Sequence, residues 1–441
     1  MDRKMTLQWF ILGLGSQLQV LFSLSVSEMI VLVIAPFLFI SELPYMRKDG
    51  VITFLYVSIL LFFGCVASLI ANHAQFYQVI RGLSITSIIV CMVVVGHYMI
   101  RRDPNGLKWY FIGVTLSTFL CIYVFQRSVE VYLAGGDTDA AAISTGKLFW
   151  VDRLNALLTV PMLAYYLKTP LFYSVGVLLF LALFSILTTT SGRSASLVFF
   201  GMAAMVLVGR KKRTSMMALG KHFMLFFCFA VLGLFLAKVA YQWAALNNVL
   251  GEEALEKYER QTVGGRGAVS LLMSGRTDAF VGLLAVADAP FLGKGYWARD
   301  TEGYRERFLA RYGTLDDYEH YKNYTAYCMK MGFLPDKGIP CHSHIVSFWV
   351  WYGLPGLIFW LYVIYVMFRY LKNDVQFVPQ WFFWLAGSVP VMLWHIFFSP
   401  FNARIGLPLY VIGMLMTRAV RLGKYQLPWK MILEIEKTER A

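Results

Sequence analysis

The residues best suited to acid–base chemistry form the tetrapeptide Cys341-His342-Ser343-His344, which leads directly into a long apolar segment. A second feature follows at a fixed distance, because Gly353-Leu354-Pro355-Gly356 begins eleven residues after His342. A histidine between a polar loop and the bilayer is partly desolvated, which favours its neutral, basic form. His342 is therefore a candidate general base; the alternative is an interfacial histidine that only caps a helix.

Three arginines are candidate anion-binding residues. Ser191-Gly192-Arg193 opens a predicted membrane helix, and Ser274-Gly275-Arg276 opens a predicted loop helix over 277–288. A cation at a helix N-terminus meets the positive end of the helix dipole, and this becomes favourable when a phosphate-like anion binds both. A membrane-flanking arginine that reaches the headgroups is the alternative for Arg193, and an ordinary loop residue is the alternative for Arg276. Arg404, at the start of the last predicted helix, either joins the same positive cluster or anchors that helix.

The pattern contains no convincing metal or nucleotide site. His342-x-His344 alone is a weak zinc signal, and no other Cys/His spacing matches a metal site. No P-loop or dinucleotide-binding fingerprint is present, so we expect neither a metal nor another cofactor. A base together with several anion-binding groups suits a reaction in which a proton leaves an acceptor hydroxyl while a pyrophosphate departs.

The composition predicts that these residues are held by membrane helices. Hydrophobic residues make up 58% of the 441 residues and charged residues only 15%, which is far from the composition of a soluble globular protein. The expected fold class is an all-α polytopic membrane protein with about 12 transmembrane helices. The predicted spans are 8–24, 27–43, 51–71, 78–100, 108–126, 151–167, 171–190, 194–209, 222–242, 344–369, 379–399 and 404–420.

Basic residues predict the orientation of these spans, because short cytoplasmic loops are enriched in Lys and Arg. Basic residues follow every second predicted span, which predicts that both termini are in the cytoplasm. The net charge of +14 is thus a topology signal, and nucleic acid is not an expected partner. The basic positions are Arg3-Lys4, Arg47-Lys48, Arg101-Arg102, Lys168, Arg210 to Arg213, Arg369 with Lys372, and the tail from Arg418 to Lys430.

One large external loop separates the ninth and tenth predicted helices. Residues 243–343 carry 13 acidic and 12 basic residues between apolar flanks, and a loop of this length is usually functional or folded. The predicted organisation is a membrane part over 1–242, this loop region with short helices, a second membrane part over 344–420 and a cytoplasmic tail over 421–441. Cys328 and Cys341 both lie in the loop, where they could form a disulfide in an oxidising compartment.

Two of these patterns resemble the bacterial O-antigen ligases and the related O-antigen polymerases. His342-Ser343, followed by nine residues, Gly353, two residues and Gly356, resembles the signature of that superfamily. Ser274-Gly275-Arg276, followed by Pro290 and Gly293-Lys294-Gly295, resembles its loop element. Arg193 and the large external loop match the family pattern as well, and the resemblance covers about residues 175–420.

The resemblance implies an inverting, metal-independent glycosyltransferase that takes its glycan from undecaprenyl pyrophosphate on the periplasmic face of the inner membrane. His342 would be the catalytic base, and Arg193 and Arg276, with Arg404 as a candidate, would bind the pyrophosphate. His344, Ser343, Gly353 and Gly356 would support the site. The partners would be membrane lipids, the lipid-linked glycan donor and a glycan-bearing acceptor.

The acceptor stays open between three cases. A ligase uses lipid A–core, a polymerase uses a second lipid-linked repeat, and related enzymes glycosylate proteins. One dominant external loop favours the ligase. A transporter of lipid-linked glycan is the alternative from another class, but transport predicts ionisable residues in mid-membrane and internal repeats. His97 and Lys238 lie toward the ends of their predicted helices, and no repeat of the helical halves is visible.

Overall fold

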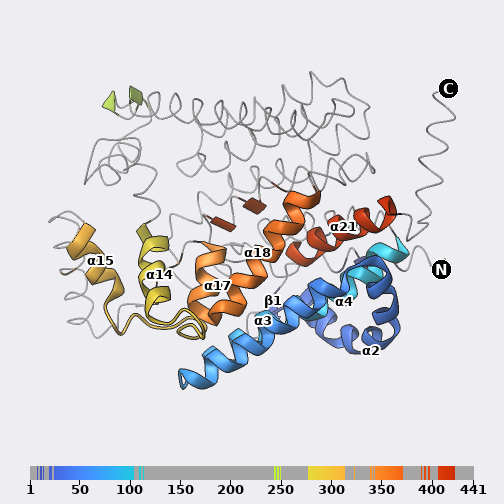
Figure 1. The fold of residues 1–441 in the computed structure, drawn as a ribbon, viewed down its shortest axis with the longest axis horizontal. Coiled ribbons are helices and arrows are strands. Elements are labelled where there is room, and N and C mark those ends of the chain that lie inside the picture. The colour runs from blue at the N-terminus through green and yellow to red at the C-terminus, as the bar shows by residue number, and fades with distance from the viewer. Residues whose placement is uncertain are drawn as a thin grey trace.

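The structure is a computed structural model, and its described part is helical apart from one small hairpin. It describes residues 24–103, 277–312, 343–370 and 406–422 continuously, with single residues or short pieces at 7–21, 109–113, 243–249, 322, 338–341 and 389–397. Figure 1 shows how these segments are arranged. The helices are α2 (Val26–Asp49), α3 (Ile52–Ala71), α4 (Phe76–Arg102), α14 (Thr277–Asp288), α15 (Tyr304–Tyr312), α17 (His344–Tyr352), α18 (Leu354–Arg369) and α21 (Gly406–Arg421).

Three described helices are long and apolar enough to cross a membrane. They are α2, α3 and α4, with 24, 20 and 27 residues. A bilayer core of about 30 Å needs about 20 helical residues, so each is sufficient. They match the predicted spans 27–43, 51–71 and 78–100. These helices are compatible with a membrane protein; most of the other predicted spans lie wholly or largely outside the described residues.

The start of α2 explains why the first predicted span is wrong. Ser25 caps α2 in extended geometry, and its side chain and that of Glu28 each accept a backbone N–H from the other residue. Helical residues occur between 7 and 13, but β1 (Gln19–Leu21) then pairs antiparallel with β2 (Leu24–Ser25). The continuous helix predicted over 8–24 is therefore absent, because the chain before a capping box has to leave helical geometry.

The span predicted over 344–369 is also wrong, because the chain reverses at Gly353. In a continuous helix His344 and Trp360 would lie about 24 Å apart, whereas their ring centroids are separated by 5.1 Å. Gly353 has φ 65° and ψ −148°, which ends α17 after nine residues and starts α18 in a new direction. A conformation of this kind is accessible to glycine and strained for other residues. The two helices form a hairpin rather than one span.

Helix α18 runs antiparallel to α3. A Cβ placed on Gly64 would lie 2.5 Å from the Cβ of Pro355, near the start of α18, while the Phe54 ring stacks 6.0 Å from that of Tyr362 further along. The Gly353 turn therefore lies beside the end of α3 and the start of α4. The basic residues at the C-terminal ends of α2, α4 and α18 lie at the other end of this group of helices, away from the Gly353 turn. This agrees with the charge pattern, which predicts that they share one side.

Candidate functional site

The described part of the candidate site consists of the α17–α18 hairpin and the segment 289–297, which follows α14 in the chain and contacts the hairpin. Ser343, His344, Gly353 and Gly356 are described. The predicted catalytic residue His342 and the predicted pyrophosphate-binding residues lie outside the described residues, and the latter are Arg193, Arg276 and Arg404. Their predicted roles therefore stay predictions.

The Ser343 side chain forms two hydrogen bonds. Ser343 is the N-cap of α17, and its Oγ accepts the backbone N–H of Val346 at 3.4 Å. The same hydroxyl donates to the carbonyl of Ile396 at 2.9 Å, and the residue is 1% exposed. A hydroxyl can donate and accept at once, so Ser343 fixes the start of α17 to another segment of the chain directly after His342.

His344 packs in the interior. It is 2% exposed, and its imidazole lies 5.1 Å from the ring of Trp360 on α18. Phe348, one turn further along α17, packs on the same Trp360 at 5.4 Å. His344 thus packs between α17 and α18, and the supporting role that the resemblance implies for it stays a prediction.

Both motif glycines are required by close backbone contacts. A Cβ on Gly353 would overlap the carbonyl group of Phe291, and a Cβ on Gly356 would overlap the carbonyl group of Phe348. The contact at Gly353 is with the segment 289–297, and the contact at Gly356 is between the start of α18 and α17. A larger residue at Gly353 would displace the backbone around Phe291, and one at Gly356 would push α18 away from α17.

The 289–297 segment packs against the turn of the hairpin at Gly353. Its Lys294 N–H donates to the carbonyl of Val350 at 2.6 Å, and its Phe291 carbonyl accepts the N–H of Leu354 at 2.9 Å. Trp349 Nε1 donates to the carbonyl of Pro290 at 3.0 Å. A helix break leaves backbone groups without helical partners, and this segment supplies those partners. The two sequence elements that carry the family resemblance therefore lie in direct contact.

Gly293 lies at the centre of this contact. Its φ is 72°, and a Cβ there would lie 2.6 Å from the Gly353 nitrogen and 2.7 Å from the Val350 oxygen. The backbone turns at Gly293, and the turn brings it against the backbone of the Gly353 turn.

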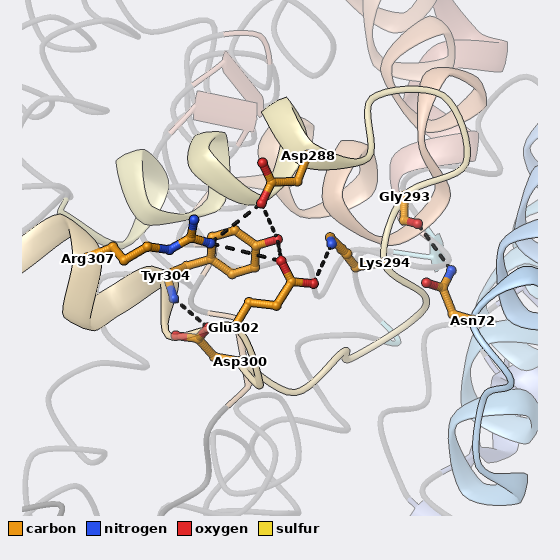
Figure 2. A network of polar contacts seen from close by, with 8 residues as sticks. All are labelled: Asn72, Asp288, Gly293, Lys294, Asp300, Glu302, Tyr304 and Arg307. Atoms are coloured by element: carbon orange, nitrogen blue, oxygen red, sulfur yellow. Dashed lines mark hydrogen bonds and ion pairs between the residues drawn. The ribbon is translucent and has the colours of Figure 1, made fainter.

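Polar side chains of α3, its C-cap and α4 hold the segment and the end of α17 from the other side. Asn72 Nδ2 donates to the carbonyl of Gly293 at 3.1 Å (Figure 2), and Gln78 Nε2 donates to the carbonyl of Trp297 at 3.1 Å. Ser68 Oγ donates to the carbonyl of Trp351 at 2.7 Å. Single polar residues near helix ends are common, so no spacing marks these three.

Helix α14, predicted over 277–288, is present over the same residues and packs alongside α17 (Figure 1). The segment after α14 contacts the last turn of α17, so the two helices run in the same direction. Their N-termini, where the backbone N–H groups point outward, therefore face the same way. In the sequence Arg276 directly precedes α14, and His342 precedes the Ser343 cap of α17.

A polar network fastens α15 to the 289–297 segment (Figure 2). The buried Tyr304 hydroxyl lies 2.8 Å from Asp288 Oδ2 and 2.6 Å from Glu302 Oε2, and Lys294 Nζ lies 2.6 Å from Glu302 Oε1. The Tyr304 hydrogen bond, with the nearby Arg307 charge, lowers the pKa of Asp288, and the hydrogen bonds from Lys294 and Tyr304 lower that of Glu302. Burial and the two carboxylates raise the pKa of Tyr304. The network is thus charged at neutral pH.

The disulfide considered between Cys328 and Cys341 stays a prediction, because Cys328 lies outside the described residues, whereas Cys341 is described. The Cys341 Sγ donates to the carbonyl of Ile339 at 3.4 Å, while its own carbonyl accepts the Ser347 hydroxyl at 2.8 Å. Within the described segments no group of three or more His, Cys, Asp or Glu side chains is arranged to hold a metal ion.

Comparisons with protein-family models, with curated proteins and with solved structures find no match to this chain.

Proposed function

We propose that the protein is an inverting, metal-independent glycosyltransferase that moves a glycan from undecaprenyl pyrophosphate to lipid A–core, as an O-antigen ligase does. The observation that carries the proposal is the contact between the 289–297 segment and the Gly353 turn. Gly293 lies against Gly353, and Lys294 and Phe291 form backbone hydrogen bonds with Val350 and Leu354. These are the two sequence elements on which the resemblance rests.

The directions of α14 and α17 support the roles proposed for Arg276 and His342. Two parallel helices that pack together present their N-terminal N–H groups to the same side. Arg276 is covalently joined to the first residue of α14, and His342 is joined to the cap of α17. An anion bound near these helix starts would meet a guanidinium, two helix dipoles and a base within one neighbourhood.

In the proposed reaction His342 takes the proton of an acceptor hydroxyl as that oxygen attacks the anomeric carbon of the donor sugar. The new glycosidic bond forms on the face opposite the leaving group, which inverts the configuration. The bond between the anomeric carbon and the pyrophosphate oxygen breaks, and its electron pair leaves with undecaprenyl pyrophosphate. Arg193, Arg276 and Arg404 would carry the charge that develops on the leaving group.

The proposal locates this reaction on the periplasmic face of the inner membrane, with both termini in the cytoplasm, as expected from the distribution of basic residues. One feature of the described structure supports this sidedness. The 289–297 segment lies at one end of the described helices, and the basic ends of α2, α4 and α18 lie at the other. The positive-inside rule assigns the basic ends to the cytoplasm.

The experiment is transfer in vitro with purified protein, a synthetic undecaprenyl-pyrophosphate glycan and a metal chelator. One arm contains rough lipopolysaccharide, and the other contains only a second lipid-linked repeat. Product on lipopolysaccharide with chelator present is expected. Elongated lipid-linked product alone would assign a polymerase instead, and the absence of product in both arms would exclude the proposed transferase.

A further inference from the structure

Four ionisable side chains form a buried cluster between α2 and α4. His97 Nδ1 lies 2.9 Å from Glu42 Oε2, and His97 Nε2 lies 3.0 Å from Asp49 Oδ2. Arg101 donates to both oxygens of Glu42 and lies over the Tyr45 ring. The side chains of His97, Glu42 and Asp49 are at most 2% exposed. The cluster lies at the helix ends opposite the Gly353 turn and takes no part in the proposed reaction.

Counting protons determines the charge of this cluster. A neutral imidazole has one N–H and one lone pair, yet both ring nitrogens of His97 face carboxylate oxygens. A lone pair facing a carboxylate would be repulsive, so one extra proton must lie on His97 or on a carboxyl. Glu42 already accepts Arg101 on both oxygens and is an ionised acceptor. The extra proton therefore belongs to the pair of His97 and Asp49.

Charge balance gives the cluster its stability. With the extra proton on His97, Arg101 and His97 supply two positive charges against the two carboxylates of Glu42 and Asp49, so the buried group is neutral. The other Asp49 oxygen, Oδ1, is buried and has no hydrogen-bond partner in the part of the chain that the structure describes. That carboxyl consequently depends on His97. Removing one member of a buried ion cluster leaves an uncompensated charge, which is strongly destabilising.

Helix α2 needs such a contact because two prolines interrupt it. Pro36 and Pro44 lie inside the helix on either side of Glu42. Each lacks the N–H that would bond to the preceding turn, which weakens the helix locally. Glu42 and Asp49 lie in this weakened half, and both bind α4 through His97. The tertiary contact replaces the backbone support that the prolines remove.

We propose that His97 is held as an imidazolium between Glu42 and Asp49, and that this charge-balanced cluster locks α2 to α4. Because the contact between α2 and α4 depends on charge balance within the cluster, its members can be replaced together but not singly. His97→Gln leaves two buried carboxylates against one arginine. Asp49→Asn removes one carboxylate and the need for the extra proton, since a neutral His97 can then donate to Glu42 and accept from the asparagine amide.

The test combines protonation and stability measurements on the full-length protein in detergent. With ¹⁵N-labelled histidine at about pH 7.5, where an ordinary histidine is mostly neutral, the spectrum of the 7 histidines should contain one doubly protonated ring that His97→Gln removes. Asp49→Asn should convert that ring to a neutral tautomer. A neutral His97 in the unmodified protein would overturn the proposal.

The stability arm uses the double variant as its matched control. His97→Gln should lower the midpoint of thermal unfolding by on the order of 5 °C or more. His97→Gln with Asp49→Asn should recover most of that loss, because charge balance returns. If His97→Gln fails to fold, recovery in the double variant still tests the lock. Unchanged melting of His97→Gln, or a double variant less stable than the single one, would contradict it.

Discussion

The backbone N–H of Leu354 donates to the carbonyl of Phe291 at 2.9 Å, across 63 positions in the sequence. This bond joins the first residue of α18 to the segment that follows α14. It exists because Gly353, immediately before Leu354, lets the backbone of Phe291 approach without a side chain between them. The hairpin and the 289–297 segment are therefore one structural unit.

Gly353→Ala should disrupt this unit. The new Cβ would overlap the Phe291 carbonyl and would also hold a positive φ, at a cost of at least about 1–3 kcal/mol. Gly303→Ala is the matched control, since Gly303 has φ 67° but a Cβ there would meet nothing closer than 3.8 Å. Thermal unfolding in detergent should show a much larger loss for Gly353→Ala. Equal losses would mean that backbone strain alone, and not the contact, explains the glycine.

Ser343→Ala should weaken the start of α17. The variant loses an N-cap and the bond to the Ile396 carbonyl, together worth about 1–3 kcal/mol. Under the proposed function, transfer should fall while binding of the lipid-linked donor persists, because the cap positions His342 and not the arginines. Ser343→Asn, which can also cap, should retain more activity. Ser84→Ala, which removes a half-buried serine of α4 that bonds only to its own helix, should leave both measurements unchanged.

Much of the membrane framework was predictable, because it depends on local patterns. The positions of α2, α3 and α4 follow from apolar runs, although α2 continues to Asp49, six residues past its predicted end, and α14 follows from its helical spacing and its start after Arg276. The reversal at Gly353 was missed because the apolar run continues through it, so hydropathy cannot distinguish a hairpin from a span. The roles of Asn72, Gln78 and the cluster around His97 depend on residues far apart in sequence, and no local pattern records such pairs.

Asn72→Ala should loosen the 289–297 segment without unfolding the membrane helices. The amide bond to the Gly293 carbonyl contributes about 1 kcal/mol. Hydrogen exchange at residues 291–295 should accelerate several-fold, while exchange within α3 stays slow. Asn247→Ala, which removes a local bond to the Trp243 carbonyl, is the control and should not change exchange at 291–295. Unchanged exchange in Asn72→Ala would show that α3 does not support the segment.

Acid should release α15 from the 289–297 segment. The folded-state pKa values of Asp288 and Glu302 lie below their ordinary values, so their contribution is present at neutral pH and is lost as pH falls through those lowered values. Tyr304→Phe removes the hydrogen bond that lowers the pKa of Asp288 most, so release should begin at a higher pH. Hydrogen exchange of residues 304–312 against pH measures this. An identical pH profile in Tyr304→Phe would exclude the hydroxyl as the cause.

The proposed chemistry depends most on His342. Single-turnover transfer from an undecaprenyl-pyrophosphate glycan to rough lipopolysaccharide should be abolished in His342→Ala, while binding of the donor lipid is retained. Arg276→Ala should instead weaken donor binding, with Arg311→Ala, an exposed arginine at the end of α15, as its control. Loss of transfer with intact donor binding in His342→Ala is the predicted result, and full transfer by His342→Ala would show that the base is another residue.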